Sequence, residues 1–148
     1  MNTVRKSVIV PHSCAEMYEF VETCERYPDF LPWCPRAEVT ERTAEITRAR
    51  LEIDYHGLKS HIVTLNHKAP PRRLTLELVE GPFKRFHGEW LFTPLGEAGC
   101  RIELAVEYAF ANVALEKILG PVFSYVTETL VDRFVEHADH PDRKILRR

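Results

Sequence analysis

With 148 residues, of which 45% are hydrophobic, the chain is long enough to form one domain, over residues 1–148, with a core of its own. A formal net charge of −2 and a pI near 6.4 exclude a global cationic field. We therefore expect no binding to DNA through phosphate contacts.

The cysteines and the amino-terminal segment indicate in which cellular compartment the protein is expected. Cysteines at positions 14, 24, 34 and 100 form neither a CxxC pair nor a second cluster, which predicts free thiols rather than a zinc or thioredoxin-like centre. The first six residues lack the apolar region of a signal peptide, and no run approaches the roughly 18 apolar residues of a membrane span. We expect a cytoplasmic protein, or one that visits a membrane peripherally.

The amino-terminal elements are predicted as a strand followed by a helix. Residues 3–10 are rich in β-branched side chains, and Pro11 and His12 end this strand. Ser13 and Glu16 match a capping box at the start of the helix. One face of this helix carries the apolar residues Met17, Phe20, Val21 and Cys24. A second short helix is expected from Cys24 to Tyr27, ending before Pro28.

The next segment, Tyr27 to Pro35, combines three prolines and three large aromatic residues within nine positions. Proline fixes its own φ and biases the preceding residue away from helix, so Tyr27, Leu31 and Cys34 are expected to be extended or in turns. The aromatic side chains need apolar surroundings. The segment is therefore predicted to be a stiff loop that fills a core or covers a cavity.

From about residue 36 to residue 110 the hydrophobicity alternates with a period of two, most clearly over residues 46–56. This alternation is typical of antiparallel strands with one face covered and one face in water. Turns are expected at His56-Gly57-Leu58, Ala69-Pro70-Pro71-Arg72, Gly81-Pro82 and Thr93 to Gly99. Together with residues 3–10, these runs give about seven strands.

A long helix is expected after Asn112, whose side chain suits an N-cap. Its apolar stripe consists of Leu119, Val122, Phe123, Val126, Leu130 and Phe134. Gly120-Pro121 should kink this helix, or Pro121 should be its true first-turn residue. Residues 141–148 are predicted to be a flexible basic tail. The order of the elements predicts an α+β fold in which one curved antiparallel sheet wraps a long C-terminal helix.

Three segments carry a resemblance to a known family: Tyr27 to Cys34 (YPDFLPWC), Val79 to Lys84 (VEGPFK) and Gly88 to Phe92 (GEWLF). With this order of elements, the chain resembles the START-like coenzyme-Q-binding family over roughly residues 3–138. That family includes the ribosome association toxin RatA proteins and belongs to the polyketide cyclase/dehydrase and lipid transport superfamily. The resemblance implies a helix-grip fold whose long helix closes a hydrophobic tunnel against the concave sheet.

The resemblance also implies a function without catalysis. The protein would bind ubiquinone, another isoprenoid quinone or a similar lipid, with no covalent cofactor, and would support respiratory electron transport as a carrier or chaperone. The chain lacks the transit peptide of the mitochondrial relatives, so the bacterial branch is the closer comparison, with transient contact at the inner membrane. For that branch the alternative is a RatA-type toxin that binds the large ribosomal subunit and blocks subunit association.

On such a scaffold, apolar and aromatic side chains are expected to line the ligand site. The predicted ligand-binding residues are Phe30, Leu31, Trp33, Leu51, Ile53, Phe83, Phe86, Trp90, Phe123, Val126 and Leu130. Trp90 is the first choice, because its ring offers a flat face and its indole N–H a donor for a quinone carbonyl. Each of these aromatic residues also fits an ordinary core position.

Polar clusters offer weaker alternatives. Asp54, His56 and His61 lie near one expected turn, and Arg85, His87 and Glu89 share one strand face, but charged residues of this kind are also expected on a solvated sheet face. No GxSxG, HExxH or P-loop motif occurs, so we predict no catalytic residue and no metal site. The candidates for a ribosome-binding surface are Arg42, Arg48, Arg50, Arg72, Arg73, Lys84, Arg85 and the C-terminal cluster, and acidic neighbours dilute them.

Overall fold

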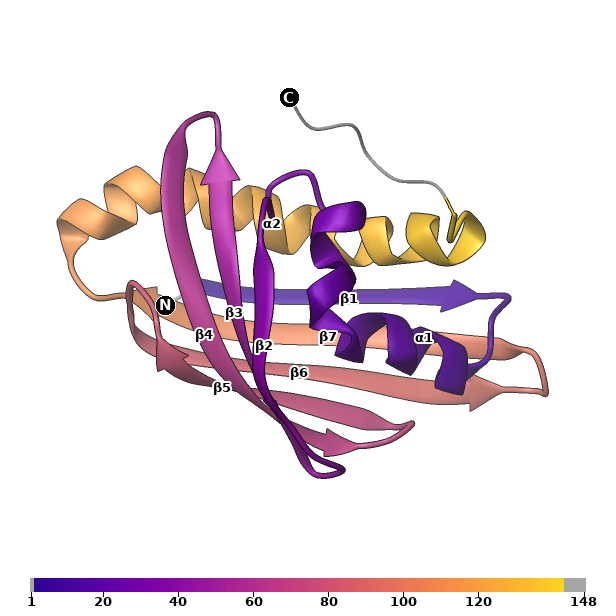
Figure 1. Cartoon of the computed structure of the whole chain (residues 1–148). Coiled ribbons are helices and arrows are strands. Elements are labelled where there is room, and N and C mark those ends of the chain that lie inside the picture. The colour runs from indigo at the N-terminus through magenta and orange to yellow at the C-terminus, as the bar shows by residue number, and fades with distance from the viewer. Residues whose placement is uncertain (1, 143–148) are drawn as a thin grey trace.

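The computed structural model describes residues 2–142 and contains one seven-stranded sheet with helices at one side of it (Figure 1). The strands are β1 (Asn2–Val10), β2 (Ala37–Arg42), β3 (Ile46–Tyr55), β4 (Leu58–Ala69), β5 (Arg73–Glu80), β6 (Phe83–Leu95) and β7 (Gly99–Phe110). The helices are α1 (Cys14–Glu22), the short 3₁₀ helix η1 (Cys24–Asp29) and α2 (Val113–Asp139).

All strand pairs are antiparallel, and the strand order is β1-β7-β6-β5-β4-β3-β2. The sheet curls so that β2, β3 and β4 cross over α2 while β1, β7 and β6 run beside it (Figure 1). This arrangement is the helix-grip architecture, and the α+β prediction is confirmed. The core lies inside the curl, where the apolar stripe of α2 meets the inward side chains of the sheet.

The alternation in the sequence places one face of each strand inward. In β3, Thr47, Ala49 and Ile53 are buried, whereas the intervening Arg48 is exposed. β3 and β4 are joined by His56 and Gly57, both with positive φ, as a tight two-residue hairpin turn requires. The expected turn from Thr93 to Gly99 is too long: β6 stays paired with β7 up to Leu95, since Pro94 removes only one backbone donor.

The amino-terminal helices follow the sequence closely, apart from Pro28. Ser13 caps α1 by accepting a hydrogen bond from the backbone N–H of Glu16 at 3.1 Å. η1 does not end before Pro28 but continues to Asp29, and Tyr27 is helical rather than extended. A six-residue 3₁₀ helix has few internal hydrogen bonds to lose, and the carbonyl of Tyr27 still accepts from Leu31 N–H at 2.8 Å.

α2 begins directly after Asn112, as the sequence predicts, and not at Pro121, which was the alternative start. The side chain of Asn112 accepts a hydrogen bond from the N–H of Leu115 at 2.9 Å. The helix is continuous through Gly120 and Pro121, so Pro121 is not its first-turn residue. Packing against the sheet outweighs the one backbone hydrogen bond that proline removes. The predicted tail at 141–148 lies, from residue 143 onward, outside the described residues.

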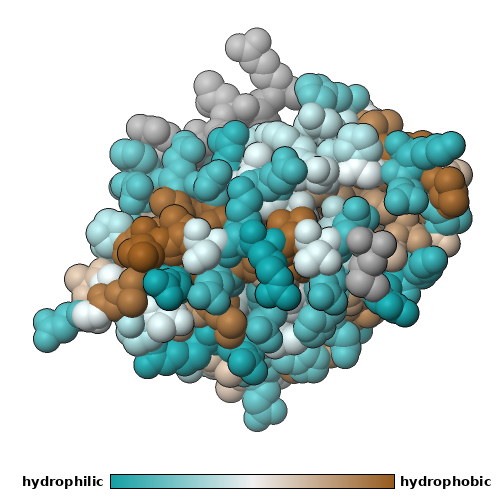
Figure 2. All heavy atoms as spheres, turned by 180° about the vertical axis from the view of Figure 1, so that it is seen from behind, coloured by the Kyte–Doolittle hydropathy of each residue, from teal (hydrophilic) through white to brown (hydrophobic). Residues whose placement is uncertain are grey.

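Hydrophobic side chains are exposed at several places on the surface of the described residues. Seen from behind, hydrophilic side chains cover most of the face, and hydrophobic ones appear in separate patches (Figure 2). The large hydrophobic residues that are exposed are Ile9, Leu58, Val79, Leu95, Val113 and Ile118. None of the helices within residues 2–142 combines the length and hydrophobicity needed to span a bilayer.

Candidate functional site

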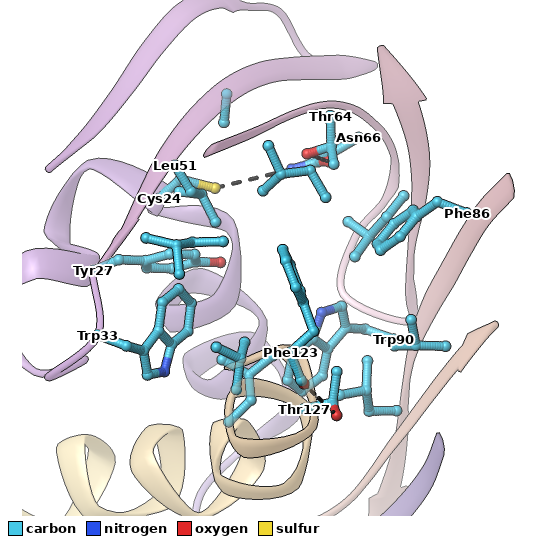
Figure 3. A pocket seen from close by; sticks show the side chains of 18 of the residues that line it. Cys24, Tyr27, Trp33, Leu51, Thr64, Asn66, Phe86, Trp90, Phe123 and Thr127 are labelled. Atoms are coloured by element: carbon cyan, nitrogen blue, oxygen red, sulfur yellow. Dashed lines mark hydrogen bonds between the residues drawn. The ribbon is translucent and has the colours of Figure 1, made fainter. Parts of the chain in front are cut away.

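A pocket lies between the concave face of the sheet and α2 (Figure 3). Its unfilled space is about 100 Å³. The walls come from η1 and the loop after it, from β3 to β7, and from α2. The lining residues are Cys24, Tyr27, Trp33, Ala49, Leu51, Ile53, Ile62, Thr64, Asn66, Leu76, Phe86, Trp90, Leu104, Val106, Phe123, Val126, Thr127, Leu130 and Phe134.

Most of the ligand-binding residues predicted from the sequence meet at this pocket. Those that line it are Trp33, Leu51, Ile53, Phe86, Trp90, Phe123, Val126 and Leu130. The other three, Phe30, Leu31 and Phe83, are buried in the core and do not line it. Their role as ligand contacts is not supported by their positions, whereas that of the lining residues stays a prediction.

Aromatic packing explains why two of these three side chains lie elsewhere. The ring of Phe30 stacks on His137 with the centroids 4.0 Å apart and also contacts Phe134, so it fixes the end of α2 to η1. Phe83 packs edge-on against Phe123 at 4.8 Å and lies against Phe110 at 5.1 Å. These rings close the core behind the pocket wall.

Polar side chains inside the pocket were missed by the sequence reasoning. Thr64 and Asn66 are buried on β4 and lie in Figure 3 on the opposite side of the pocket from Trp90 and Thr127. The hydroxyl of Thr64 donates to Oδ1 of Asn66 at 2.8 Å. Their inward position follows from the period of β4, because Ile62, two residues before Thr64, also points inward.

Two residues of the pocket lining have a donor group with a weak hydrogen-bond partner or none: the side-chain amide of Asn66 and the indole N–H of Trp33. The side-chain amide of Asn66 has two N–H groups, and within the described residues its one partner is the sulfur of Cys24 at 3.9 Å. Nε1 of Trp33 is buried and has no hydrogen-bond partner among the described residues. A sulfur atom is a weak acceptor, so the amide of Asn66 favours a guest that carries an acceptor oxygen. The Trp33 nitrogen has almost no accessible surface and does not face the open space of the pocket.

The pocket is electrically neutral. None of its lining residues is an acid, a lysine or an arginine. Burial raises the pKa of Cys24 to about 12 and, together with the neighbouring Cys24, raises the pKa of Tyr27 well above its ordinary value. Both groups are therefore uncharged near neutral pH, and the Tyr27 hydroxyl donates to the carbonyl of Val21. A charged guest would find no counter-ion here.

Four of the residues that line the pocket are only half-buried, so the pocket wall reaches the protein surface at these positions. Leu51 on β3 and Leu130 on α2 are only partly buried, as are Leu76 on β5 and Phe86 on β6. Beside Leu51, Tyr55 contacts Tyr125 of α2 with the ring centroids 4.8 Å apart. These are the places where small side-chain movements would connect the pocket with solvent.

A glycine helps to shape the wall between Phe86 and Trp90. A Cβ on Gly88 would lie 3.0 Å from Cδ1 of Leu76, which pairs with Gly88 across β5 and β6. Because Gly88 has no side chain, Leu76 can lie across this position.

The charged clusters singled out in the sequence lie away from the pocket lining. Oδ1 of Asp54 accepts from the N–H of Gly57 at 3.1 Å and supports the turn. His61 bonds Glu80 at 2.6 Å, and both are partly exposed. Arg85 and His87 are exposed on β6. Within residues 2–142 no group of three or more His, Cys, Asp or Glu side chains is placed to hold a metal ion.

Comparisons with known proteins agree with this architecture. Residues 10–135 match the family model described as polyketide cyclase / dehydrase and lipid transport. The ribosome association toxin RatA of Pseudomonas aeruginosa is 33% identical over 135 residues, which cover 91% of this chain and 94% of that protein. The mitochondrial coenzyme Q-binding protein COQ10 homolog B of Xenopus laevis is more distant, 25% identical over 138 residues, 90% of this chain and 56% of that protein.

Solved structures show the same fold at low sequence identity. The Zhui aromatase/cyclase from Streptomyces sp. R1128 superposes with a TM-score of 0.83 at 16% identity, covering 96% of each chain. A START superfamily protein from Mycobacterium smegmatis gives a TM-score of 0.78 at 16% identity, over 94% of this chain and 98% of that one. The chain thus belongs to the polyketide cyclase / dehydrase and lipid transport family, and within it to the group of the ribosome association toxin RatA proteins.

Proposed function

We propose that this protein binds an isoprenoid quinone such as ubiquinone, or a similar neutral lipid, in the pocket under α2, and acts as a carrier or chaperone for it. The observation that carries the proposal is an apolar, uncharged pocket with a weakly engaged amide donor, that of Asn66, on its wall. The similarity to a coenzyme Q-binding protein supports the ligand class at a distance. The proposal includes no catalytic step and no covalent cofactor.

The chemistry of the walls favours a neutral ring with carbonyl oxygens. Asn66 offers an amide N–H from β4, and Trp90 offers its indole N–H and a flat ring from β6, on the other side of the pocket (Figure 3). A quinone has acceptor oxygens at opposite edges of its ring, which suits donors on two walls. A fatty-acid carboxylate would be buried without a cation, at a cost of several kcal/mol.

The size of the pocket limits how the ligand enters. Ligand pockets usually measure roughly 300–1,000 Å³, and the unfilled space here is about 100 Å³. A ring fits a cavity of this order, whereas a prenyl tail requires Leu51 and Leu130 to move apart. Each buried CH₂-sized group of the tail contributes about 0.8 kcal/mol. A long tail would extend outside, consistent with transient docking at a membrane.

The test is extraction of the protein after purification from a bacterial host that makes quinone. Organic extraction and mass spectrometry should yield quinone in a near-stoichiometric amount, and Asn66→Leu should lower the yield several-fold. His67→Leu is the matched control, because the next residue of β4 is exposed on the other face. An extract without quinone from folded wild-type protein would refute the proposal.

A second variant separates loss of ligand from loss of stability. Trp90→Ala removes the proposed ring platform, and Phe92→Ala removes a ring that is equally buried on the same strand but does not line the pocket. Both should lower the melting temperature. Only Trp90→Ala should reduce the quinone bound per folded molecule, and an equal reduction in both variants would contradict the assignment of Trp90.

The second candidate function is a toxin that binds the large ribosomal subunit and blocks subunit association. It rests on the name and similarity of the RatA relatives, 33% identical over most of the chain. Several basic residues proposed for this surface are paired with acids: Arg42 with Glu22 and Glu25, Arg50 with Glu52 and Glu80, and Arg73 with Glu89. Arg48, Arg72, Lys84 and Arg85 are exposed and have no ion-pair partner within residues 2–142. Of these, Lys84 and Arg85 are neighbours on β6 and line one surface hollow together, so they are the better candidates.

Sedimentation with ribosomal subunits tests this function. The protein should migrate with the large subunit at low salt, dissociate as salt rises, and lower the fraction of joined ribosomes. Replacing Lys84 and Arg85 together by Gln should weaken binding, whereas Arg50→Gln, at a site already neutralised by acids, should not. Failure to migrate with the subunit at low salt would remove this function without affecting the quinone proposal.

A further inference from the structure

Two of the four cysteines lie in contact, far from each other in sequence. Sγ of Cys14 is 2.8 Å from Sγ of Cys100, and 86 positions separate the two residues along the chain. A disulfide bond is about 2.05 Å long, so the two sulfur atoms need to approach by less than 1 Å to bond. Neither residue lines the pocket, and the proposed function uses neither of them.

Both cysteines sit on well-anchored backbone. Cys14 is the first residue of α1, directly after the capping Ser13. Cys100 lies at the start of β7, where it is paired with Val10 of β1 on one side and with Pro94 of β6 on the other. Because both backbones are fixed by hydrogen bonds, the thiols stay close to each other rather than meeting only in rare fluctuations.

We propose that Cys14 and Cys100 form a redox-sensitive pair that a peroxide converts into a disulfide. The sulfur of Cys14 attacks one oxygen of hydrogen peroxide, the O–O bond breaks, and water leaves, which makes a sulfenic acid on Cys14. The sulfur of Cys100 then attacks the sulfur of Cys14, the S–O bond breaks, and a second water leaves. The two thiols lose two electrons, and the peroxide gains them.

The environment decides which sulfur reacts first. Cys100 is fully buried, and burial, together with the nearby Cys14, raises the pKa of its thiol to about 12, although Arg72 acts in the opposite direction. Cys14 retains 7% exposure, so peroxide reaches it more readily. Cys100 therefore serves as the resolving thiol, for which proximity to the oxidised sulfur matters more than exposure. The burial of both makes the reaction slow compared with that of an exposed thiol.

The disulfide would connect the start of α1 to β7. The same end of the molecule already holds a contact between His12 and Asp139 at 2.7 Å, which joins this region to the end of α2. A cross-link over so long a loop restricts the unfolded chain strongly. The oxidised protein should therefore melt at least about 5 °C higher than the reduced protein.

Peptide mapping of the full-length protein decides the proposal. Reduced protein is treated with hydrogen peroxide, alkylated, and digested without reductant. A peptide pair linked through Cys14 and Cys100 is expected, together with a higher melting temperature that a dithiol reductant reverses. Cys14→Ser and Cys100→Ser should each abolish the link and the shift, whereas Cys24→Ser should retain both.

Two results would overturn the proposal. One is alkylation of both Cys14 and Cys100 in wild-type protein after peroxide treatment of the folded state. The other is a gain of oxygen atoms at Cys14 without any linked peptide. Because both results come from the wild type, a folding defect in a serine variant does not affect the decision.

Discussion

Glu22, the last residue of α1, ties the helix to three strands through one carboxylate. Oε1 of Glu22 accepts from the hydroxyl of Thr47 on β3 at 2.5 Å, from Nζ of Lys68 on β4 at 3.1 Å and from Nε of Arg42 on β2 at 3.1 Å. Burial alone would raise the pKa of Glu22, but these hydrogen bonds outweigh it and hold the pKa below its ordinary value of 4.5. The ionised form is therefore the one that stabilises the fold.

Glu22→Gln should lower the free energy of unfolding by about 2 kcal/mol at neutral pH, because hydrogen bonds to a charged acceptor are lost. Lys68 loses its carboxylate partner, whereas Arg42 keeps Glu25. Since the folded pKa is depressed, the advantage of wild type over the variant is complete above the ordinary pKa of 4.5 and disappears as the pH falls through the folded pKa. Urea unfolding at several pH values measures it. A difference that does not change with pH would contradict the assignment.

His137 is a second residue whose ionisation bears on stability. Its ring is buried against Phe30, and burial, with a smaller effect of Arg26, lowers its pKa below 6.5 against the opposing effect of Asp29. The unfolded state therefore takes up a proton first as the pH falls below 6.5, and stability decreases. His137→Phe should remove this loss. The melting temperature of the variant, relative to that of wild type, should therefore rise as the pH falls from neutral to pH 5. An unchanged gap would show that His137 takes up a proton as readily in the folded state as in the unfolded state.

At the scale of elements, α2 contains a position that limits its own stability. Gly120 lies inside the helix, and a Cβ added there meets no atom within 4 Å. Gly120→Ala should therefore raise the free energy of unfolding by about 1 kcal/mol, because alanine restricts the unfolded chain more than glycine. Chemical denaturation measures the gain. No gain, or a loss, would mean that the helix at Pro121 needs the freedom of glycine.

The elements themselves were largely predictable from the sequence, because period-two strands and apolar helix stripes depend on local alternation. The errors occurred at prolines. Pro28 was expected to end a helix, and Pro121 either to kink the long helix or to begin it; Pro28 lies inside η1, and Pro121 lies inside α2 rather than at its start. Proline costs a local hydrogen bond, but the packing of Tyr27 and of the α2 stripe against the sheet is a tertiary effect that no local pattern contains.

The candidate site was predictable in its apolar part only. Trp90 and Phe123 were identified as large apolar residues, whereas Phe30 and Phe83 look the same in sequence and pack behind the wall. Asn66 was missed because a polar residue within a strand suggests the solvated face. The alternation along β4 could have identified it, because Asn66 lies an even number of residues from the apolar Ile62 and therefore on the same face of the strand.

At the scale of the whole molecule, ligand binding should stabilise the fold, because a guest in the pocket contacts the sheet, η1 and α2 together. A ubiquinone analogue with a short alkyl tail, at 100 times its dissociation constant, should add about 2.7 kcal/mol and raise the melting temperature by about 5–10 °C. Oleate should give a smaller shift, since no cation lines the pocket. An equal or larger shift with oleate would contradict recognition of a neutral head group.

The strand order has a consequence for how the protein is made. Among the described residues, β1 lies at the edge of the sheet and pairs with β7 alone, so the first strand of this sheet to leave the ribosome pairs with the last. At a synthesis rate of roughly 5–20 residues per second, the nascent β1 waits about 5–20 s before β7 emerges. The apolar side of β1, with Val4, Val8 and Val10, is uncovered throughout that interval. Chaperone capture of stalled nascent chains should thus be strongest before residue 99 and fall once residue 110 has cleared the exit tunnel.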